Sequence, residues 1–527
     1  MEKKDYKVIS DVSIMRKKVF LTILCFLLAL GFVMVIFYLV VGRKTDAWLD
    51  GTSGLSRASV FPFVFSSGDD LYAVDEDLNV SDIDNNTSNA ILDNNLKKVY
   101  YIYSPSNELY EYDVKNKTRV MLCPGVESFK LFKERTNIPY NATDGSIKLY
   151  SLNSKSSSVI RETVETEDRT VPSSALDFVL GKNSIVFFDN FDLDKGTASL
   201  KQWLSGGDIV TLSEGVFYTK SPVILANDTA VAYYTDAGLC VSPRSGEALT
   251  VPGNASLVRT NDFAYAELLL VPPTGFDASE NIKYYYTGTS DPNSSGSDIY
   301  EISVSLRSVT GNKIAEKVHS IINYSKKYST LIYSIEEDGD YLIYSVRPGS
   351  RPDLITKAPF DTSVYYDVSS DLLYLINADN TINTIDIFDK HRSDFEASGG
   401  IGTVAPYFGK PFSVVYSKDF KTKTIILKQS GIETYPATEF RLYGKSDSIY
   451  LKARSITGKS TVSLDLVNGS EAKRITNSCN SSCIIYDKDI SGIIYYDSGT
   501  LYYFKNGVRS VIGDFDADVL PVNVLTD

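Results

Sequence analysis

Short stretches in which apolar and polar residues alternate, each followed by a polar break, recur through most of the chain. Clear examples are residues 97–118, 364–382 and 492–507, where two alternating runs flank a turn of Ser, Asp, Asn or Gly. Alternation with a period of two is typical of half-buried strands, and small polar residues favour tight turns. Residues 336–340 (EEDGD) fit the same scheme as a hairpin turn, with Gly339 supplying positive φ. The pattern therefore predicts hairpins of short strands.

The second strand of these hairpins often begins Leu-Tyr, and this Leu-Tyr pair recurs at a nearly constant spacing. Leu71, Leu109 and Leu149 are separated by 38 and 40 residues. A unit of about 40 residues with four short strands has the size of one propeller blade. One small twisted sheet cannot bury both of its faces alone, whereas sheets packed side by side can. We predict an all-β fold over residues 55–527, a β-propeller of about seven or eight blades with irregular blades in the middle.

One segment breaks the period of two. Within Asn312–Lys327, the apolar residues Ile314, Val318, Ile321 and Ile322 fall at helical spacing. Two interpretations remain open for this segment: a helix packed on a blade, or a twisted pair of strands.

A long apolar run precedes the repeats. Val19–Val41 contains 23 residues and no charge. As a helix it would be about 34 Å long at ~1.5 Å per residue, which exceeds a hydrocarbon core of roughly 30 Å. The run is longer than the ~7–15 apolar residues of a cleaved signal peptide, and Gly42, Arg43 and Lys44 follow it. We predict an uncleaved signal anchor that crosses the cell membrane once.

The cations that flank the apolar run predict its orientation. Two follow it, and six precede it: Lys3, Lys4, Lys7, Arg16, Lys17 and Lys18. Because positive flanks stay in the cytoplasm, residues 1–18 are expected to be a cytoplasmic tail, 42–54 a linker and 55–527 an extracytoplasmic domain.

Composition and charge narrow the possible partners. The 36 Tyr and 25 Phe against 2 Trp suit strands on half-buried surfaces. The chain carries a net charge of −13; residues 1–44 hold eight Lys/Arg and three Asp/Glu, or +5, so the remainder carries −18. Such an acidic domain will not attract nucleic acid or anionic lipid by charge. We expect a protein or a cell-surface glycan as partner.

The cysteines allow covalent links. Four of the five lie outside the apolar run, which permits two disulfides in an oxidising compartment with three pairings. Cys479 and Cys483, in the sequence Cys-Asn-Ser-Ser-Cys, can form a local bridge or remain free buried thiols. A zinc site is disfavoured because neither histidine lies near a cysteine in sequence.

A search for catalytic chemistry finds no motif. The chain has no Gly-x-Ser-x-Gly elbow, and its histidines, His319 and His391, stand without neighbouring motifs, as surface residues do. Asp189, Asp192 and Asp194 in FFDNFDLDKG offer closely spaced oxygens that can bind calcium. The loop is too short for an EF-hand, and an ordinary Asp-rich turn is the alternative. No other metal or cofactor is expected.

Two short motifs carry a family resemblance. Tyr233–Asp236 (YYTD), and Tyr495–Asp497 before Gly499–Tyr502 (GTLY), resemble the Tyr-Trp-Thr-Asp blades of low-density-lipoprotein-receptor propellers. They also look like the TolB-like and DUF5050-type bacterial propellers, which repeat Tyr-Tyr…Leu-Tyr. Each motif spans three to five residues, and Tyr234 stands where tryptophan is usual. The resemblance implies a β-propeller with a binding or scaffolding role, and no particular ligand.

These observations support two main functional hypotheses. The first is a membrane-anchored binding or scaffolding module that recognises a protein or a cell-wall glycan. The second is a polysaccharide hydrolase or lyase with a pair of carboxylates in the propeller channel. A third reading, a sensor, would need a partner to relay its signal, because residues 1–18 leave no room for a signalling domain.

Overall fold

A computed structural model describes residues 55–525 with gaps, all within one compact unit formed by Gly54–Asn261 and Glu267–Asp527. The gaps are residues 58, 133, 165–170, 226–227, 252–255, 258, 261–266, 269–281, 289–296, 306, 326–329, 348, 368–371, 378–380, 397–400, 407–411, 418–423, 429–430, 436–439, 444–448, 456–460 and 469–470. The expected tail, anchor helix Val19–Val41 and linker lie outside the described residues. Within the described part, no helix is long and apolar enough to cross a membrane.

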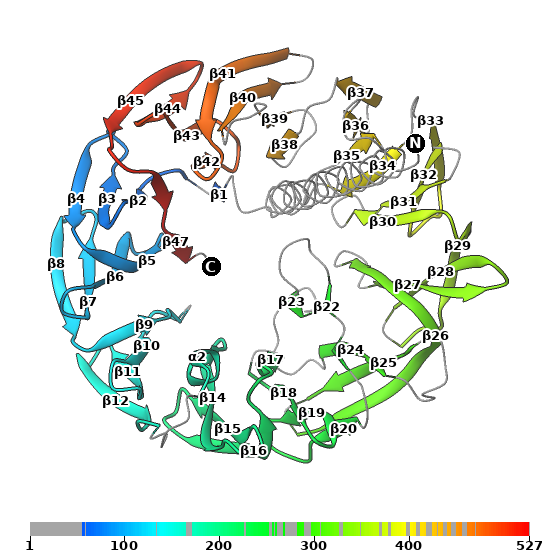
Figure 1. Ribbon diagram of the computed structural model, residues 1–527, viewed down its shortest axis with the longest axis horizontal. Helices are drawn as coiled ribbons and strands as arrows, with labels where there is room; N and C mark the ends of the chain where they lie inside the picture. Colours follow the sequence, from blue (N-terminus) through cyan, green and yellow to red (C-terminus); the bar gives the residue numbers. More distant parts are fainter. Residues whose placement is uncertain are drawn as a thin grey trace, which may run out of the picture. The chain divides into compact units, whose positions relative to one another are not determined.

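The described chain is built of strands in small sheets, with α2 (Ser173–Leu176) as its one helix, and the strands pair antiparallel except for β1 with β42 and β47 with β5. We number the ten sheets of four or more strands by the order of their central strands along the chain, so that the sheet of β2 and β3 is sheet 1 and the sheet of β42–β45 is sheet 10 (Figure 1). The strands of sheets 1 to 3 are β46 (Val519–Pro521), β2 (Phe63–Ser67), β3 (Asp70–Val74) and β4 (Val80–Asp84); β47 (Asn523–Leu525), β5 (Thr87–Asp93), β6 (Lys98–Tyr103), β7 (Glu108–Asp113) and β8 (Thr118–Cys123); and β9 (Val126–Phe129), β10 (Asn137–Ala142), β11 (Ile147–Ser151) and β12 (Ser156–Arg161).

Sheets 4 to 6 follow in the same manner. Their strands are β13 (Val179–Leu180), β14 (Ser184–Asp192), β15 (Thr197–Leu204) and β16 (Ile209–Phe217); β17 (Val223–Leu225), β18 (Ala230–Thr235), β19 (Gly238–Pro243) and β20 (Leu249–Val251); and β21 (Ser256–Leu257), β24 (Ile282–Gly288), β25 (Ser297–Val304), β26 (Val309–Ser325), β27 (Thr330–Glu337), β28 (Asp340–Val346) and β29 (Asp353–Pro359). A separate two-stranded sheet consists of β22 (Arg259–Thr260) and β23 (Glu267–Leu268).

Sheets 7 to 10 complete the described chain. Their strands are β30 (Ser363–Asp367), β31 (Leu372–Ile376), β32 (Thr381–Asp386) and β33 (Arg392–Glu396); β34 (Ile401–Pro406), β35 (Phe412–Ser417), β36 (Thr424–Lys428) and β37 (Gly431–Tyr435); β38 (Phe440–Tyr443), β39 (Ile449–Ser455), β40 (Thr461–Asn468) and β41 (Glu471–Asn480); and β1 (Leu55–Arg57), β42 (Ile484–Asp487), β43 (Gly492–Asp497), β44 (Thr500–Lys505) and β45 (Val508–Asp514).

Inner strands read as continuous apolar runs because both of their faces are covered. In β6, Val99 and Tyr101 pack against sheet 1, whereas Tyr100 and Ile102 pack against sheet 3. All four side chains are buried. The same alternation recurs in β14 and β18, each of which divides its side chains between the preceding and the following sheet. Sheets 2, 4 and 5 therefore each share two apolar interfaces, as radially packed sheets do.

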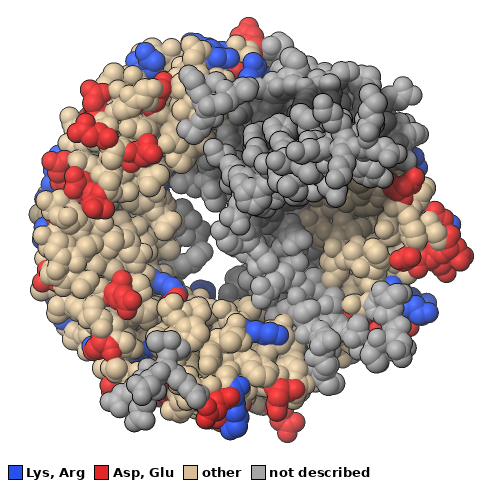
Figure 2. All heavy atoms as spheres, in the orientation of Figure 1, with Lys and Arg blue, Asp and Glu red and all other residues tan. Residues whose placement is uncertain are grey.

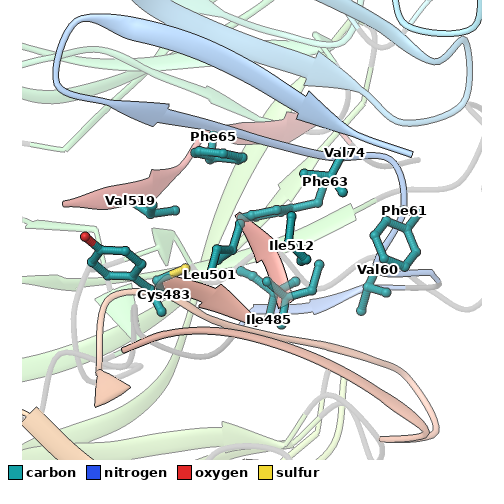
Figure 3. Close-up of a cluster of buried hydrophobic side chains, with 12 residues drawn as sticks. Val60, Phe61, Phe63, Phe65, Val74, Cys483, Ile485, Leu501, Ile512 and Val519 are labelled. Carbon is teal, nitrogen blue, oxygen red and sulfur yellow. The ribbon is translucent and has the colours of Figure 1, made fainter. Parts of the chain in front are cut away.

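The series of sheets closes on itself. Apolar clusters join neighbouring sheets from sheet 1 through sheet 7, and another joins sheet 10 to sheet 1. At the closure, β46, the next-to-last strand, pairs with β2, and the first strand, β1, pairs with β42. Figure 3 shows Phe63 and Phe65 of sheet 1 facing Leu501 and Ile512 of sheet 10. Sequential small sheets with the last packed on the first form a propeller-type arrangement.

The predicted hairpins are confirmed, but the predicted number of sheets is too small. Residues 97–118, 364–382 and 492–507 contain the pairs β6–β7, β30–β31 and β43–β44. Ten sheets of four or more strands occur among the described residues, against the seven or eight expected. The expected irregularity in the middle is confirmed by sheet 6, which has seven strands and from which β22 and β23 are split off, whereas its neighbours, sheets 5 and 7, have four strands each.

The helix considered for Asn312–Lys327 is wrong. Residues 312–325 of this segment belong to β26, a strand of 17 residues, and the last two lie outside the described residues. Its pairing with β25 shifts between Ala315 and Val318, where Lys317 has φ of +54°. Such a bulge inserts an extra residue, so that buried positions fall three apart and imitate a helical period.

Candidate binding site

A pocket of about 210 Å³ lies beside the first strands of three successive sheets, β9, β13 and β17. Because these strands enter their sheets at equivalent positions, their flanking residues converge. The lining residues are Lys130, Ser174, Asp177, Phe178, Val179, Leu180, Val186, Phe187, Phe188, Ser221 and Pro222. The pocket thus combines an apolar wall with a small number of polar groups, as ligand sites do.

A short helical turn places two of the lining residues. Pro172 stands at the N-cap of α2 with φ of −55°, where its missing N–H removes no helical hydrogen bond. Ala175 is fully buried, and α2 contacts β14. The helix ends at Leu176, and its C-cap Asp177 has ψ of 166°, which turns the chain into an extended path toward β13. Asp177 and Phe178 therefore leave the helix at the pocket wall.

The polar part of the wall is a network around Asp177. Lys130 Nζ lies 2.8 Å from Asp177 Oδ2, and it also donates to the carbonyl of Phe178. The same ammonium lies 4.5 Å from the centroid of the Phe178 ring. Asn141 Nδ2 and the Phe178 N–H donate to Asp177 Oδ1 at 2.9 and 2.8 Å. A cation, a carboxylate and an aromatic ring are thus fixed side by side.

The network favours the ionised form of Asp177. Desolvation by burial acts to raise the pKa of this carboxyl group. The hydrogen bond and charge of Lys130, with the hydrogen bond from Asn141, outweigh it and lower the pKa below its ordinary value. Asp177 is therefore ionised at neutral pH and acts as a hydrogen-bond acceptor, not as a proton donor.

A buried arginine supports the back of the pocket. Arg161, at the end of β12, is 3% exposed. Its guanidinium donates to the carbonyl of Phe188 at 3.2 Å and to that of Gly145 at 3.0 Å. Burial lowers the pKa of Arg161 to about 10, so the group stays cationic at neutral pH. Arg161 thus ties a pocket-lining strand of sheet 4 to sheet 3.

The aspartates considered for calcium occupy the β14–β15 hairpin. Asp189 Oδ2 lies 2.6 Å from the ammonium of Lys201, and Asp192 Oδ2 lies 2.8 Å from that of Lys195. Asp194 is exposed in the turn. Among the described residues, no three His, Cys, Asp or Glu side chains are grouped closely enough to hold a metal ion. Two of these carboxylates therefore form ion pairs with lysines, and the three aspartates do not form a common site.

Cys479 and Cys483 are both fully buried, and both thiols are free in this structure. Burial raises the pKa of each thiol, so neither is a reactive thiolate at neutral pH. His319 and His391 are exposed, in agreement with the sequence interpretation. Sequence reasoning missed Lys130 and the turn around Asp177 because no local motif marks them. The Pro172 that precedes α2 was the one available signal.

Comparisons with known proteins add little to this geometry. No family model and no curated protein sequence matches the chain. A crystal structure of the eukaryotic initiation factor is 10% identical, covers 79% of this chain and 96% of its own, and has a TM-score of 0.39. The oligogalacturonate lyase of Vibrio parahaemolyticus is 11% identical, with coverages of 63% and 94% and a TM-score of 0.28.

A third similar structure is PorZ, a bacterial surface component of the type-IX secretion system of Porphyromonas gingivalis. It is 11% identical, covers 82% of this chain and 52% of its own, and has a TM-score of 0.23. Likenesses at this level say nothing about ligand or activity. The assignment of a function rests on the chain's own residues.

Proposed function

We propose that this protein is a non-catalytic binding protein, held at the outer face of a membrane by Val19–Val41, whose pocket takes a glycan of the cell surface. The observation that carries the proposal is the wall formed by Lys130, Asp177 and Phe178. An ammonium donor and a fixed carboxylate acceptor suit the hydroxyl groups of a sugar, and the Phe178 ring, 2% exposed, holds the ammonium in place from behind.

The size of the pocket favours a small part of a glycan. Its volume of about 210 Å³ lies below the roughly 300 Å³ at which pockets for drug-sized ligands begin. A terminal sugar unit would fill it, with the remainder of the polymer outside. A folded protein partner would need a broader surface, on the order of 800 Å² per side.

The alternative raised from the sequence, a polysaccharide hydrolase or lyase, has less support. Canonical glycoside hydrolysis needs two carboxyl groups that face each other across the bond to be broken. Asp177 is the only carboxylate among the described residues that line the pocket, and its lowered pKa makes it unsuitable as a general acid. The pocket is therefore better fitted to hold a sugar than to cleave one.

A glycan array tests the proposal. The purified full-length chain in detergent should bind a subset of cell-wall or capsular glycans without releasing products. Asp177→Asn should weaken binding about tenfold or more, because a charged hydrogen-bond acceptor is lost while the shape is kept. Lys130→Met should have a similar effect.

The matched control is Lys195→Met, which removes an exposed lysine paired with Asp192 on the neighbouring hairpin. It should leave glycan binding unchanged, and thermal melts should show that all variants remain folded. Product release by the unmodified chain, or equal binding by Asp177→Asn and the control, would contradict the proposal.

A further inference from the structure

A second feature lies on sheet 6, away from the residues of the pocket. The ring centroid of His319 is 5.0 Å from that of Tyr341, which is 4.7 Å from that of Phe360. The His319 side chain and Phe360 are each 40% exposed, and Tyr341 is half-buried. Three rings in contact at a surface form a contiguous patch, and such patches mark interaction sites more often than scattered apolar residues do. We call these three residues the aromatic row.

The β27–β28 hairpin beside the row is strongly acidic. Its two-residue turn has φ of +50° at Asp338 and +85° at Gly339, which is the geometry of a type I′ turn. Four of the five residues at this tip are acidic: Glu336, Glu337, Asp338 and Asp340. Figure 2 shows Asp and Glu side chains gathered where this hairpin lies.

The strand register brings the acidic hairpin and the aromatic row together. Glu336 pairs directly with Tyr341 across β27 and β28. Glu336 Oε2 also lies 3.3 Å from His319 Nδ1, and its side chain remains 52% exposed. Carboxylate oxygen and ring faces are therefore presented to solvent at one place.

One internal cation already meets this hairpin. Lys357 Nζ, on β29, lies 2.8 Å from Asp340 Oδ2, and the hydrogen bond to Asp340 raises the pKa of Lys357. Among the described residues, Lys357 is the only lysine or arginine in an ion pair with these four acidic residues, so most of their negative charge is left uncompensated. The surface is thus built to attract further cations.

We propose that the aromatic row and the acidic hairpin 336–340 form a docking surface for a Lys/Arg-rich segment of a partner protein. Guanidinium and ammonium groups bind ring faces and carboxylates together, which a neutral sugar does not. A second copy of this chain is a poorer occupant, because a net charge of −13 would set like charges against each other. The acidic hairpin selects the partner by charge, and the rings supply the close contact.

Fluorescence anisotropy with a labelled short peptide of alternating Arg and Gly tests this docking surface on the full-length chain in detergent. Phe360→Ser removes one ring without changing any charge, and should weaken binding about two- to fivefold. Phe360→Leu keeps apolar area but removes the π face, and should weaken binding as well. Replacing Glu336 and Glu337 by Gln should weaken binding at low salt and flatten its salt dependence.

The control is Phe388→Ser, because Phe388 is 56% exposed and lies under Arg347 at 5.3 Å, outside the aromatic row. It should leave peptide affinity unchanged. Equal affinities for the Phe360 and Phe388 variants would reduce the effect to general charge attraction and overturn the proposal. Equally tight binding of an uncharged peptide or a neutral oligosaccharide, or a dimer that Phe360→Ser dissolves, would also overturn it.

Discussion

The closing seam and sheet 6 each join two groups of strands, the seam with strands from the two ends of the chain and sheet 6 with one continuous strand. We define the closing seam as the strand pairs β46–β2 and β1–β42 with the apolar cluster of Figure 3. Its contacts join the two ends of the described chain: the Ser66 hydroxyl donates to the carbonyl of Leu520, 454 positions away. In sheet 6, the long strand β26 joins the strands on its two sides. Its first part pairs with β25, and its last part pairs with β27.

The difference concerns where the stability of the fold resides. Strands joined by short hairpins lose little entropy when they pair, whereas pairing the two chain ends closes a loop of the whole domain. The seam therefore has to be rich in apolar contact. Phe65 stacks or meets edge to face with Phe63, Tyr72 and Phe515 at ring-centroid distances of 4.9–5.3 Å. We infer that damage to the seam weakens the whole domain, and damage to sheet 6 stays local.

The largest effect is expected from a charge placed in the seam. Val519 in β46 is fully buried between sheets 1 and 10. Val519→Asp should reduce the free energy of unfolding by about 4 kcal/mol or more, because a carboxylate would be buried without a partner. Urea unfolding followed by circular dichroism measures the loss.

The neighbouring residue provides the control for this prediction. Leu520 lies on the same strand but is 50% exposed. Leu520→Asp should therefore change stability by no more than about 0.5 kcal/mol. If both variants were equally stable, β46 would not be part of the closing seam in solution.

Much of this architecture was readable from the sequence. Both faces of the inner strands are buried, so their apolar runs and polar turns stand out in residues 97–118 and 492–507. Leu71, Leu109 and Leu149 repeat because each lies on the next-to-last strand of its sheet, where the leucine is buried. The apolar spacing in 312–327 suggested a helix because a bulge at Lys317 disrupts the period of two that a strand would show. Bulges depend on backbone pairing, which the residue pattern does not show.

The candidate site was beyond sequence reasoning for a different reason. Lys130 and Asp177 lie 47 positions apart and come from different sheets. Only the packing of sheet 3 on sheet 4 brings them to 2.8 Å. The acidic aspartates 189, 192 and 194 were conspicuous in sequence, yet two of them pair with lysines of their own hairpin. Local clustering of like residues is thus a poor guide to a site formed between sheets.

A cavity in sheet 6 should have a smaller and more local effect than the seam mutation. Leu331 in β27 is fully buried in a cluster with Val318 and Val346. Leu331→Ala should cost about 2–3 kcal/mol, at the lower end of core truncations, because the sheet is held by local hairpins. Hydrogen exchange should rise mainly in residues 297–346. Equal acceleration in sheets 1 and 10 would contradict the contrast between seam and sheet.

The smallest change in stability should come from mutating the bulge that lets β26 pair with β25 on one side and β27 on the other. Lys317 has φ of +54°, a conformation that costs a residue with a Cβ about 1 kcal/mol or more, whereas glycine adopts it freely. Lys317→Gly keeps the backbone N–H that donates to Asp298 Oδ1 at 3.3 Å. It should stabilise the protein by about 0.5 kcal/mol after the added entropy of the unfolded glycine.

Two further variants sharpen the test of the bulge. Lys317→Val should destabilise by about 1–2 kcal/mol, because a β-branched side chain tolerates positive φ least. Glu316→Gly, at the adjacent position without positive φ, should destabilise by about 0.5–1 kcal/mol. Urea unfolding should rank Lys317→Gly above the unmodified chain in stability, with Glu316→Gly below it and Lys317→Val lowest. If the two glycine variants lost stability equally, the backbone at Lys317 would not be held in the left-handed region, and β26 would not owe its double pairing to a bulge there.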